Sequence, residues 1–372
     1  MKMKIETITP VHIGSGSDYG SPEFYMAKAE DRNVVVRADI NHVFMMLPDE
    51  WKDQFIIELE DPKFNLQSFL GRVMKQLPKG SLGKIRLYYS YLKSQVPENI
   101  AEHVKTSHQA YIPGSSLKGS VKSALLYDLV DDDSISRVES LIKRGRKGKP
   151  EIKLWDSQRF VDSLLSSDAR KAPNTSIMRF LQVTDTSPVR RMSIHSVNSV
   201  KVHSTGWGWY KHSEDIGTTY METIDVGNEL EFDMNFNQKE SVIKKLNLEY
   251  KQEYLSPESV LDCIYRFSDD LIENEIEFAK NYRVKFLEDF YEDLSEINTP
   301  EGPVINVGQG TGFLAKTIGL KIRKYDKENY TQIYDKVRES TRGRNYPEEF
   351  PKTRRIVMED KVPMGWVKVE LK

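Results

Sequence analysis

Residues 111–120 read Tyr-Ile-Pro-Gly-Ser-Ser-Leu-Lys-Gly-Ser, a segment rich in small, hydroxyl-bearing and basic side chains. Pro113 has no backbone donor and Gly114 tolerates a positive φ, so the sequence predicts a sharp turn at this pair. Ser115 or Ser116 is then the expected N-cap of a helix, because a serine hydroxyl accepts from the free N–H groups of a first turn. The turn would place N–H donors beside hydroxyl groups.

Two lysines add positive charge to the same predicted helix. Lys118 and Lys122 lie one turn apart and are expected to point together, away from the apolar face. Free N–H groups, the positive end of a helix, hydroxyls and ammonium groups in one place suit a phosphate. The segment therefore predicts a cradle for an RNA backbone, and a capped surface helix with solvated lysines is the competing interpretation. The residues at helical spacing that are expected to be buried are Leu117, Val121, Ala124 and Leu125.

Two further segments combine glycines with polar residues. Residues 8–16 read Ile-Thr-Pro-Val-His-Ile-Gly-Ser-Gly, and residues 307–313 read Val-Gly-Gln-Gly-Thr-Gly-Phe. The second segment has the spacing G-x-G-x-G rather than the G-x-G-x-x-G of a dinucleotide loop, and no βαβ unit with a downstream acid is evident. A nucleotide-triphosphate loop is excluded at residues 111–120, because Lys118 precedes Gly119 and the spacing is short. Close approach of a backbone without Cβ atoms to an RNA phosphate is the favoured use of these glycines.

The three segments together resemble the motifs of the RAMP superfamily, the RNA-binding subunits of CRISPR effector complexes. Residues 111–120 are similar to the family's Ile-Pro-Gly-Ser-Ser-Leu-Lys-Gly signature, residues 8–16 to its first strand and following loop, and residues 307–313 to its glycine-rich loop. All three occur in the family's order. The chain length and the closing Pro363-Met364-Gly365-Trp366 look most like the end subunit of the type III-A (Csm) complex.

The resemblance implies an α+β fold of two ferredoxin-like, RRM-related halves, with antiparallel sheets, helices on one face and large insertions. It implies a non-catalytic subunit that holds the 3′ region of the crRNA, caps the filament of backbone subunits and supports crRNA maturation in antiviral defence. The implied partners are crRNA, the other subunits of the type III-A complex and crRNA-trimming nucleases. No cofactor or metal is implied for this subunit.

RNA held in such a complex is gripped mainly through phosphates and 2′-hydroxyls, with bases stacked rather than read. Tyr19, Phe24 and the aromatic residues of 207–210 could stack on bases, and burial in the core is the alternative for each of them. His12 could contact RNA or cap the first strand. The expected RNA-binding residues are His12, Gly14, Ser15, Gly16, Gly114, Ser115, Ser116, Lys118, Lys122, Gly308, Gly310, Gly312 and Lys316.

A metal-dependent endoribonuclease of the same fold is the alternative function. The resemblance implies that the cleaving subunits of such complexes use an aspartate in the loop after the first strand, and this chain offers Asp18 and Glu23 there. Neither acid matches the cleaving pattern, so no catalytic residue is assigned. A free-standing RNA-binding protein is a third class, but it would not explain the acidic second half of the chain.

The composition is that of a soluble protein, with 372 residues, 38% of them hydrophobic and 30% charged. No apolar run approaches the ~20 residues of a membrane-spanning helix, and we expect a cytoplasmic protein with no membrane partner. The single cysteine, Cys263, excludes an internal disulfide and a cysteine-cluster zinc site, and is expected to be packed rather than reactive.

The formal net charge of −2 is low for a protein that coats nucleic acid, but the charges are segregated. A local RNA footprint on a neutral body is therefore expected, with solvated charged faces as the competing interpretation. The acids gather at 131–133 and between about 256 and 294. The basic stretches are Lys143, Arg144, Arg146, Lys147, Lys149 and Lys153; Lys316, Lys321, Arg323, Lys324 and Lys327; and Arg342, Arg344, Lys352, Arg354 and Arg355.

Two halves are expected, residues 1–215 with a basic insertion near 143–153, and residues 216–372 with a long acidic helix and the glycine-rich loop. A stripe of apolar residues in the long helix from residue 257 is expected to be core rather than a surface for a partner subunit. Strands are predicted at 3–9, 33–38, 84–92, 178–183, 192–203, 304–307 and 366–371, a hairpin at 220–236, and helices at 39–46, 64–77, within 109–130 and at 311–318.

Overall fold

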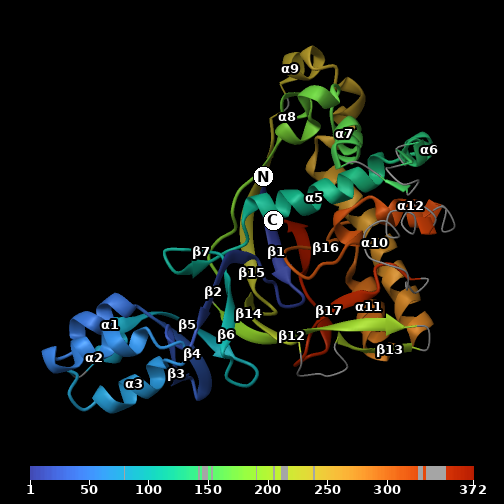
Figure 1. Ribbon diagram of the computed structural model, residues 1–372. Helices are drawn as coiled ribbons and strands as arrows, with labels where there is room; N and C mark the ends of the chain where they lie inside the picture. The colour runs from blue at the N-terminus through green and yellow to red at the C-terminus, as the bar shows by residue number, and fades with distance from the viewer. Residues whose placement is uncertain are drawn as a thin grey trace.

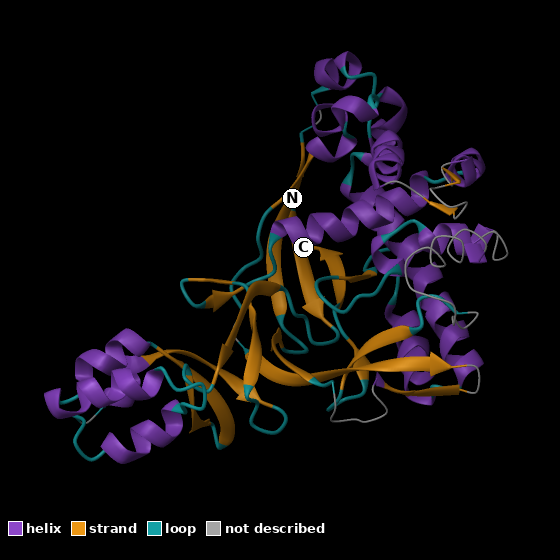
Figure 2. Ribbon diagram, in the orientation of Figure 1, coloured by secondary structure: helices purple, strands orange, loops and turns teal. Residues whose placement is uncertain are grey.

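The structure is a computed structural model. It describes the whole chain except residues 79, 141, 142, 145–149, 152, 153, 190, 204, 205, 211–216, 238, 326–329 and 332–348. Two sheets form the centre of the molecule, and helices gather on one side of this body and in a lobe that projects from it (Figure 2). The mixture of helices with mainly antiparallel sheets confirms the predicted α+β class. No helix in the described ranges has both the length and the apolar character needed to span a membrane.

The five-stranded sheet is antiparallel throughout and has the order β11-β15-β1-β19-β16. Its central strand is the first in the chain, and Ile5 pairs with Leu230 on one side and Val369 on the other. The two termini therefore lie close together (Figure 1). Helices α5 (Gly114–Leu129) and α10 (Pro257–Tyr282) pack against this sheet. The strands are β1 (Lys2–Thr7), β11 (Leu181–Val183), β15 (Glu229–Phe236), β16 (Val304–Asn306) and β19 (Trp366–Leu371).

The ten-stranded sheet has the order β2-β6-β14-β12-β5-β4-β3, with β13 and β17 on β12 and β18 on β17. Most of its pairings are antiparallel, but β12 with β5 and β14 with β6 are parallel. Its strands are β2 (Gly14–Gly20), β3 (Phe24–Ala29), β4 (Arg32–Ala38), β5 (Arg86–Leu92), β6 (Asn99–His103), β12 (Met192–His203), β13 (Gly206–Trp209), β14 (Thr219–Ile224), β17 (Thr353–Val357) and β18 (Val362–Pro363).

The projecting lobe has its own hydrophobic core. Phe55, Phe64 and Phe69 are buried at its centre with their rings in mutual contact, and every buried member of this cluster lies between residues 25 and 91. Strand β5 joins the lobe to the body by pairing with both β4 and β12. The helices of the lobe are α1 (Ile40–Met46), α2 (Asp49–Leu59), α3 (Leu66–Val73) and α4 (Ser81–Ile85).

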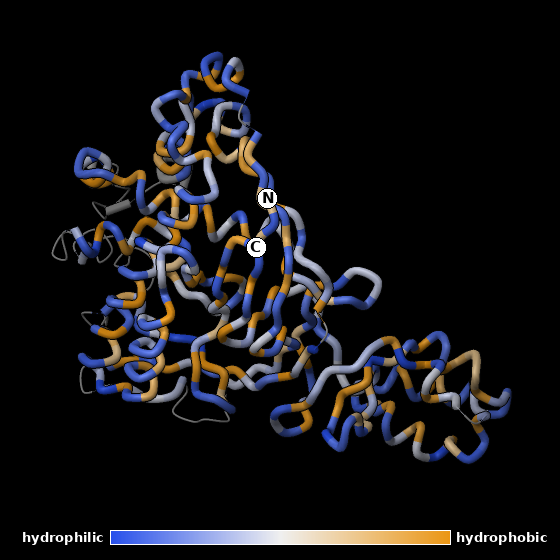
Figure 3. The backbone as a smooth tube through the Cα atoms, turned by 180° about the vertical axis from the view of Figure 1, so that it is seen from behind, coloured by the Kyte–Doolittle hydropathy of each residue, from blue (hydrophilic) through white to orange (hydrophobic). Residues whose placement is uncertain are grey.

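The predicted long helix is two helices, α10 and α11 (Lys285–Ile297), which pack against each other. Arg283 adopts a left-handed conformation with φ 57° and caps α10 with its N–H, which ends the helix. The predicted apolar stripe is confirmed as core. In Figure 3 polar and apolar stretches alternate along these helices. Cys263 is buried, and burial raises the pKa of its thiol to about 12, so the predicted packed role is confirmed.

The predicted hairpin at 220–236 is wrong. Strands β14 and β15 lie in that segment, but β14 pairs with β12 and β6, whereas β15 pairs with β1 and β11. The turn between them, where Gly227 has φ 74°, carries the chain from one sheet to the other. Alternation along a strand shows that one face is buried, but it does not identify the neighbouring strand.

The other differences from the sequence prediction are smaller. The expected helix at 311–318 is a short 3₁₀ turn at Leu314–Lys316 followed by α12 (Gly319–Tyr325), and the expected strand at 178–183 begins with a 3₁₀ turn. A boundary at residue 215 would cut both sheets, because each contains strands from both sides of it. The ferredoxin-like topology of each half stays a prediction.

The remaining elements lie around the body. The basic insertion is held by β9 and β10, which pair with each other, while residues 145–149, 152 and 153 lie outside the described residues. These elements are β7 (Lys105–Thr106), β8 (Gln109–Ala110), β9 (Lys143–Arg144), β10 (Pro150–Glu151), α6 (Asp132–Ser140), α7 (Leu154–Leu165), α8 (Ala172–Thr175), α9 (Glu240–Lys245) and the 3₁₀ turns Ala169–Lys171, Ile177–Arg179 and Glu249–Tyr254.

Candidate nucleic-acid interface

A buried carboxylate lies beneath the first motif. The Glu222 side chain on β14 is fully buried and accepts hydrogen bonds from the Tyr19 hydroxyl (2.8 Å) and the His103 N–H (3.1 Å). It also forms an ion pair with Lys105, whose side chain is only 6% exposed. A buried charge is stable only when it is paired and its lone pairs are used. These bonds tie β2, β6 and β7 to β14 and fix β2, the strand on which the first motif ends.

His103 joins the first motif to the second. Its Nδ1 accepts from the Ile13 N–H (3.1 Å), so its Nε2 carries the proton and donates to the Tyr111 carbonyl (3.1 Å). The ring is neutral in this role, and burial lowers its pKa to about 3. Sequence reasoning did not single out His103, because nothing in its spacing links it to residues 13 and 111.

His12 is also a structural residue. Its ring is 1% exposed, and Nδ1–H donates to the Glu222 carbonyl at 2.6 Å. Burial lowers the pKa of the imidazole. The burial favours the structural alternative, in which His12 anchors the first motif to β14, and its RNA contact stays a prediction. The exposed part of this motif is Gly14, Ser15 and Gly16, where the β2–β6 pairing is interrupted.

The second motif starts α5 in a different way from the prediction. Gly114 is not one of the described glycines that have a positive φ. Its N–H donates to the Asp185 carboxylate (2.8 Å). A Cβ at this position would lie 2.3 Å from the Val183 carbonyl oxygen. Neither Ser115 nor Ser116 caps the helix, since Pro113 occupies the N-cap. Gly114 therefore serves close packing, and its N–H is already used within the protein.

The two lysines of the second motif diverge, so the prediction that they point together is wrong. The Lys118 ammonium donates to the Leu181 carbonyl (2.7 Å), and burial lowers its pKa. The Lys122 ammonium has no hydrogen-bond or ion-pair partner in the described part of the chain. Of the two, only Lys122 lines the groove described below.

The glycine-rich loop closes against the first motif. The Gln309 N–H donates to the His12 carbonyl (2.8 Å), and a Cβ on Gly308 would lie 2.4 Å from that same oxygen. Gly308 also has φ 86°, a conformation that L residues rarely adopt. The Lys316 ammonium donates to the Gly308 carbonyl (2.8 Å), and burial lowers the pKa of Lys316. Gly308 thus serves packing and turning of the loop.

The three motifs meet at one groove of about 720 Å³. Gly14 lines it from the first motif, and Ser116, Ser120 and Lys122 line it from the second motif and its helix. Gly308 and Gln309 line it from the third motif, and Lys316 from the turn that follows. Ser120 also donates to the Asn306 carbonyl (2.7 Å), which holds α5 against β16. No aspartate or glutamate is among the described residues that line the groove. In a chain of net charge −2, the groove is a locally positive surface suited to a phosphate backbone.

The remaining predicted contacts lie elsewhere. Lys118, Gly114, Gly310 and Gly312 do not line this groove. Ser15, Gly16 and Ser115 are exposed, but they do not line the groove. A Cβ on Gly310 would press on Met364 at 3.1 Å, whereas one on Gly312 would meet nothing within 4 Å, although both glycines have φ 88°.

The two acids of the first loop do not form a catalytic site with the groove. Glu23 is paired with Arg37 at 2.7 Å. Asp18 is exposed and lines a separate hollow with Gln95 and Thr219. Within the described ranges, no group of three or more histidine, cysteine, aspartate or glutamate side chains is arranged to hold a metal ion.

The aromatic residues proposed to stack on bases are mostly packed. Tyr19 and Phe24 are 2% and 4% exposed, which excludes stacking on a surface-bound strand. Trp207 and Trp209 contact each other and both contact Phe286 of α11, with ring centroids 5.5 to 6.2 Å apart. The structure therefore favours packing for the two tryptophans.

Three members of the predicted basic stretches are neutralised by acids within the protein. Arg323 pairs with Glu349 (2.5 Å), and Arg354 pairs with Glu275 (2.5 Å), all four side chains being buried. Lys324 pairs with Asp270. Four members of the basic stretches, Lys153, Lys327, Arg342 and Arg344, lie outside the described residues, as do those within 145–149.

We expect Gly114→Ala and Gly119→Ala to have opposite effects on stability. The Cβ at 114 collides with a backbone carbonyl, which should cost about 2–3 kcal/mol or more. At 119, inside α5, a Cβ meets nothing within 4 Å, and alanine should stabilise the helix by about 1 kcal/mol. Urea unfolding of both variants measures this, and equal effects would contradict the packing role of Gly114.

Acid should destabilise the protein through His103. Its folded-state pKa of about 3 lies below the usual 6.5, so the unfolded chain binds the proton more tightly and stability falls as the pH drops below about 6.5. The loss should reach about 2 kcal/mol near pH 5. Urea unfolding at pH 7 and pH 5 should show that His103→Gln loses less than the parent protein. An identical loss in both would show that His103 is not the titrating group.

Comparison with known proteins places the chain in a family. Over its full length it is 24% identical to the CRISPR system Cms protein Csm5 of Methanocaldococcus jannaschii, covering 89% of that protein. It superposes with a TM-score of 0.69 and 21% identity on a chain of a Csm-crRNA-target RNA ternary complex from a type III-A CRISPR-Cas system, with both chains fully covered. The crystal structure of T. onnurineus Csm5 gives a TM-score of 0.62 at 20% identity, covering 98% of this chain and 99% of that one. The RAMP superfamily model matches residues 4–314, and the chain therefore belongs to the RAMP superfamily.

Proposed function

We propose that this protein is a crRNA-binding structural subunit of a type III-A CRISPR effector complex. In this role it holds the 3′ region of the crRNA, caps the filament of backbone subunits and supports crRNA maturation in antiviral defence in the cytoplasm. Its partners are crRNA, the other complex subunits and crRNA-trimming nucleases. The observation that carries the proposal is the groove in which all three motifs meet, with two lysines and no carboxylate among its described lining residues. The full-length similarity to a protein named Csm5 supports it.

RNA binding in this groove is mainly electrostatic and independent of base sequence. Lys122 supplies an ammonium group without a partner in the described residues, and Ser116 and Ser123 offer hydroxyls along the same wall of α5. Gly119, exposed on that wall, leaves room for a sugar-phosphate to approach the helix. Contacts of this kind fix the position of a strand without reading its bases.

Replacing Lys122 should weaken RNA binding equally across sequences. Lys122→Ala should lower the salt slope of log K for single-stranded RNA by about 0.7. Lys118→Ala is the matched control, because it removes the same charge from a lysine one turn away in the same helix. The Lys118 ammonium is already bound to the Leu181 carbonyl. Filter binding or fluorescence anisotropy at several salt concentrations measures both.

Gly119→Glu tests the groove by a different route. A Cβ at this position meets no heavy atom within 4 Å, so the protein should fold normally, while the carboxylate repels the phosphate backbone and should reduce affinity about tenfold. Gly119→Ala should bind RNA almost normally. Unchanged affinity in both Lys122→Ala and Gly119→Glu, with intact folding, would rule out this groove as the RNA site.

The complex itself is tested by purification of the tagged protein from its native cells. The proposal predicts that the other type III-A subunits co-purify with it and that sequencing of the bound RNA returns crRNAs. Lys122→Ala should reduce the crRNA recovered per protein. Recovery of the protein alone, or with unrelated RNA, would favour a free-standing RNA-binding protein.

We further propose that the subunit binds RNA without cutting it. Metal-assisted cleavage needs an acid beside the bound backbone, and Asp18 and Glu23 both lie outside the groove lining. The purified protein should leave labelled RNA intact in magnesium or manganese, and Asp18→Ala should not change target cleavage by the assembled complex. Metal-dependent cutting that is removed by EDTA and by Asp18→Ala would establish the endoribonuclease alternative.

A further inference from the structure

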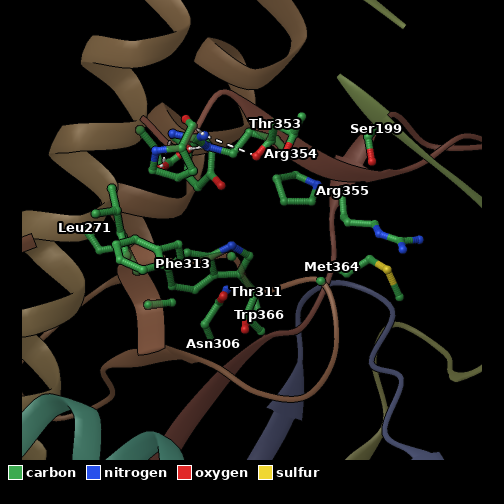
Figure 4. Close-up of a pocket in the computed structure, with 18 of the residues that line it drawn as sticks. Ser199, Leu271, Asn306, Thr311, Phe313, Thr353, Arg354, Arg355, Met364 and Trp366 are labelled. Carbon is green, nitrogen blue, oxygen red and sulfur yellow. Dashed lines mark hydrogen bonds and ion pairs between the residues drawn. The ribbon is translucent and has the colours of Figure 1, made fainter. Parts of the chain in front are cut away.

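A second cavity lies on the other side of the glycine-rich loop. Its volume is about 610 Å³, within the range of small-molecule sites. One end is apolar and aromatic, with Leu271, Phe313 and Trp366 side by side in Figure 4. The Phe350 ring contacts Phe313 there, with centroids 5.0 Å apart. Phe313 and Phe350 line the cavity, and both residues are half-buried.

The polar groups beneath this aromatic end are already satisfied. In the orientation that suits both neighbours, the Asn306 amide accepts from Trp366 Nε1 (3.0 Å) and donates to the Thr311 carbonyl (3.1 Å). Arg354 is paired with Glu275 and donates to the Pro351 carbonyl (2.7 Å). The aromatic end is therefore a rigid wall that offers ring surface rather than free charge.

Arg355 at the opposite end of the cavity differs from Arg354 (Figure 4). Its guanidinium makes one hydrogen bond, to the Thr219 hydroxyl at 3.1 Å, and no carboxylate pairs with it among the described residues. Burial alone lowers its pKa, with no opposing acid. A partly buried guanidinium with free donors is suited to a phosphate, which it binds in a planar, bidentate manner.

The cavity lies next to the proposed RNA groove, because Ala315 lines both spaces. Gly312, which lines the cavity, is exposed, and a side chain there would meet nothing within 4 Å. A strand that lies in the groove therefore finds open surface at Gly312 where it would cross the loop. This adjacency favours a nucleotide of the bound strand over a free one.

We propose that this cavity captures one unstacked nucleotide of the bound RNA, with its base against Phe313 and Phe350 and its phosphate on Arg355. The inference rests on the proposed RNA-binding function and adds a second site to it. The groove grips the backbone, while the cavity holds a single base out of the stack. Because stacking on aromatic rings is tolerant of base identity, the site selects an accessible base rather than a sequence.

The test uses the full-length protein with single-stranded RNAs that carry 2-aminopurine at one position at a time. One position should show a fluorescence change on binding that its neighbours lack. Phe313→Leu should abolish that change and weaken binding roughly tenfold, and Arg355→Gln should lower the salt slope by about 0.7. Arg72→Gln, which removes an arginine of the lobe, is the matched control and should alter neither.

The outcomes separate the two proposals. If Lys122→Ala weakens binding but no 2-aminopurine position stands out and Arg355→Gln has no effect, the cavity proposal is wrong and the groove stands. If the RNA does not bind at all, the proposed function fails. If Phe313→Leu is unstable, Arg355→Gln still tests the proposal. A second test is an RNA that is abasic at the position with the fluorescence change. The parent protein should bind this RNA roughly tenfold more weakly than the intact RNA. Saturable binding of AMP that RNA does not displace would assign the cavity to a free nucleotide instead and overturn the proposal.

Discussion

The pairing of the buried Glu222 carboxylate is the interaction on which the groove between the three motifs depends. The carboxylate has no exposed surface, so its charge must be balanced and its oxygens occupied from within the protein. Lys105 supplies the charge, and Tyr19 and the His103 backbone supply hydrogen bonds. Each donor comes from a different strand or strand pair. The cost of leaving the carboxylate unpaired therefore specifies how these strands meet and where the end of the first motif lies.

The motifs form one surface because backbone groups of each are bonded to another. His103 connects residues 13 and 111, and the His12 carbonyl receives the N–H of Gln309. Glycine is required at 114 and 308 by backbone oxygens that would lie 2.3 to 2.4 Å from a Cβ. These two glycines serve assembly, whereas Gly119 and Gly312 face open space. The glycines of these motifs thus differ in their surroundings, because some allow close packing and others leave open surface.

The sequence predicted the α+β class, most elements and the three motif segments, because periodicity and local residue chemistry are encoded over short distances. It did not predict which strands pair: β14 and β15 are consecutive but lie in different sheets. It also failed where long-range contacts decide a side chain's direction. Lys118 and Lys122 are equivalent by spacing, yet only the Lys118 ammonium donates to the Leu181 carbonyl. Arg354 and Arg355 are neighbours, yet only the first meets a carboxylate.

The pairing of β1 with both β15 and β19 makes assembly of the body a late event in synthesis. At about 5–20 residues per second, β19 leaves the ribosome tens of seconds after β1. The lobe, whose core is local, can pack during that interval, whereas β1 keeps one edge unpaired until β19 is made. Unpaired strand edges can pair incorrectly with other chains, and chaperones limit such pairing in cells. A nascent chain that stops before residue 307 lacks one wall of the groove, so the groove forms only in a nearly finished subunit.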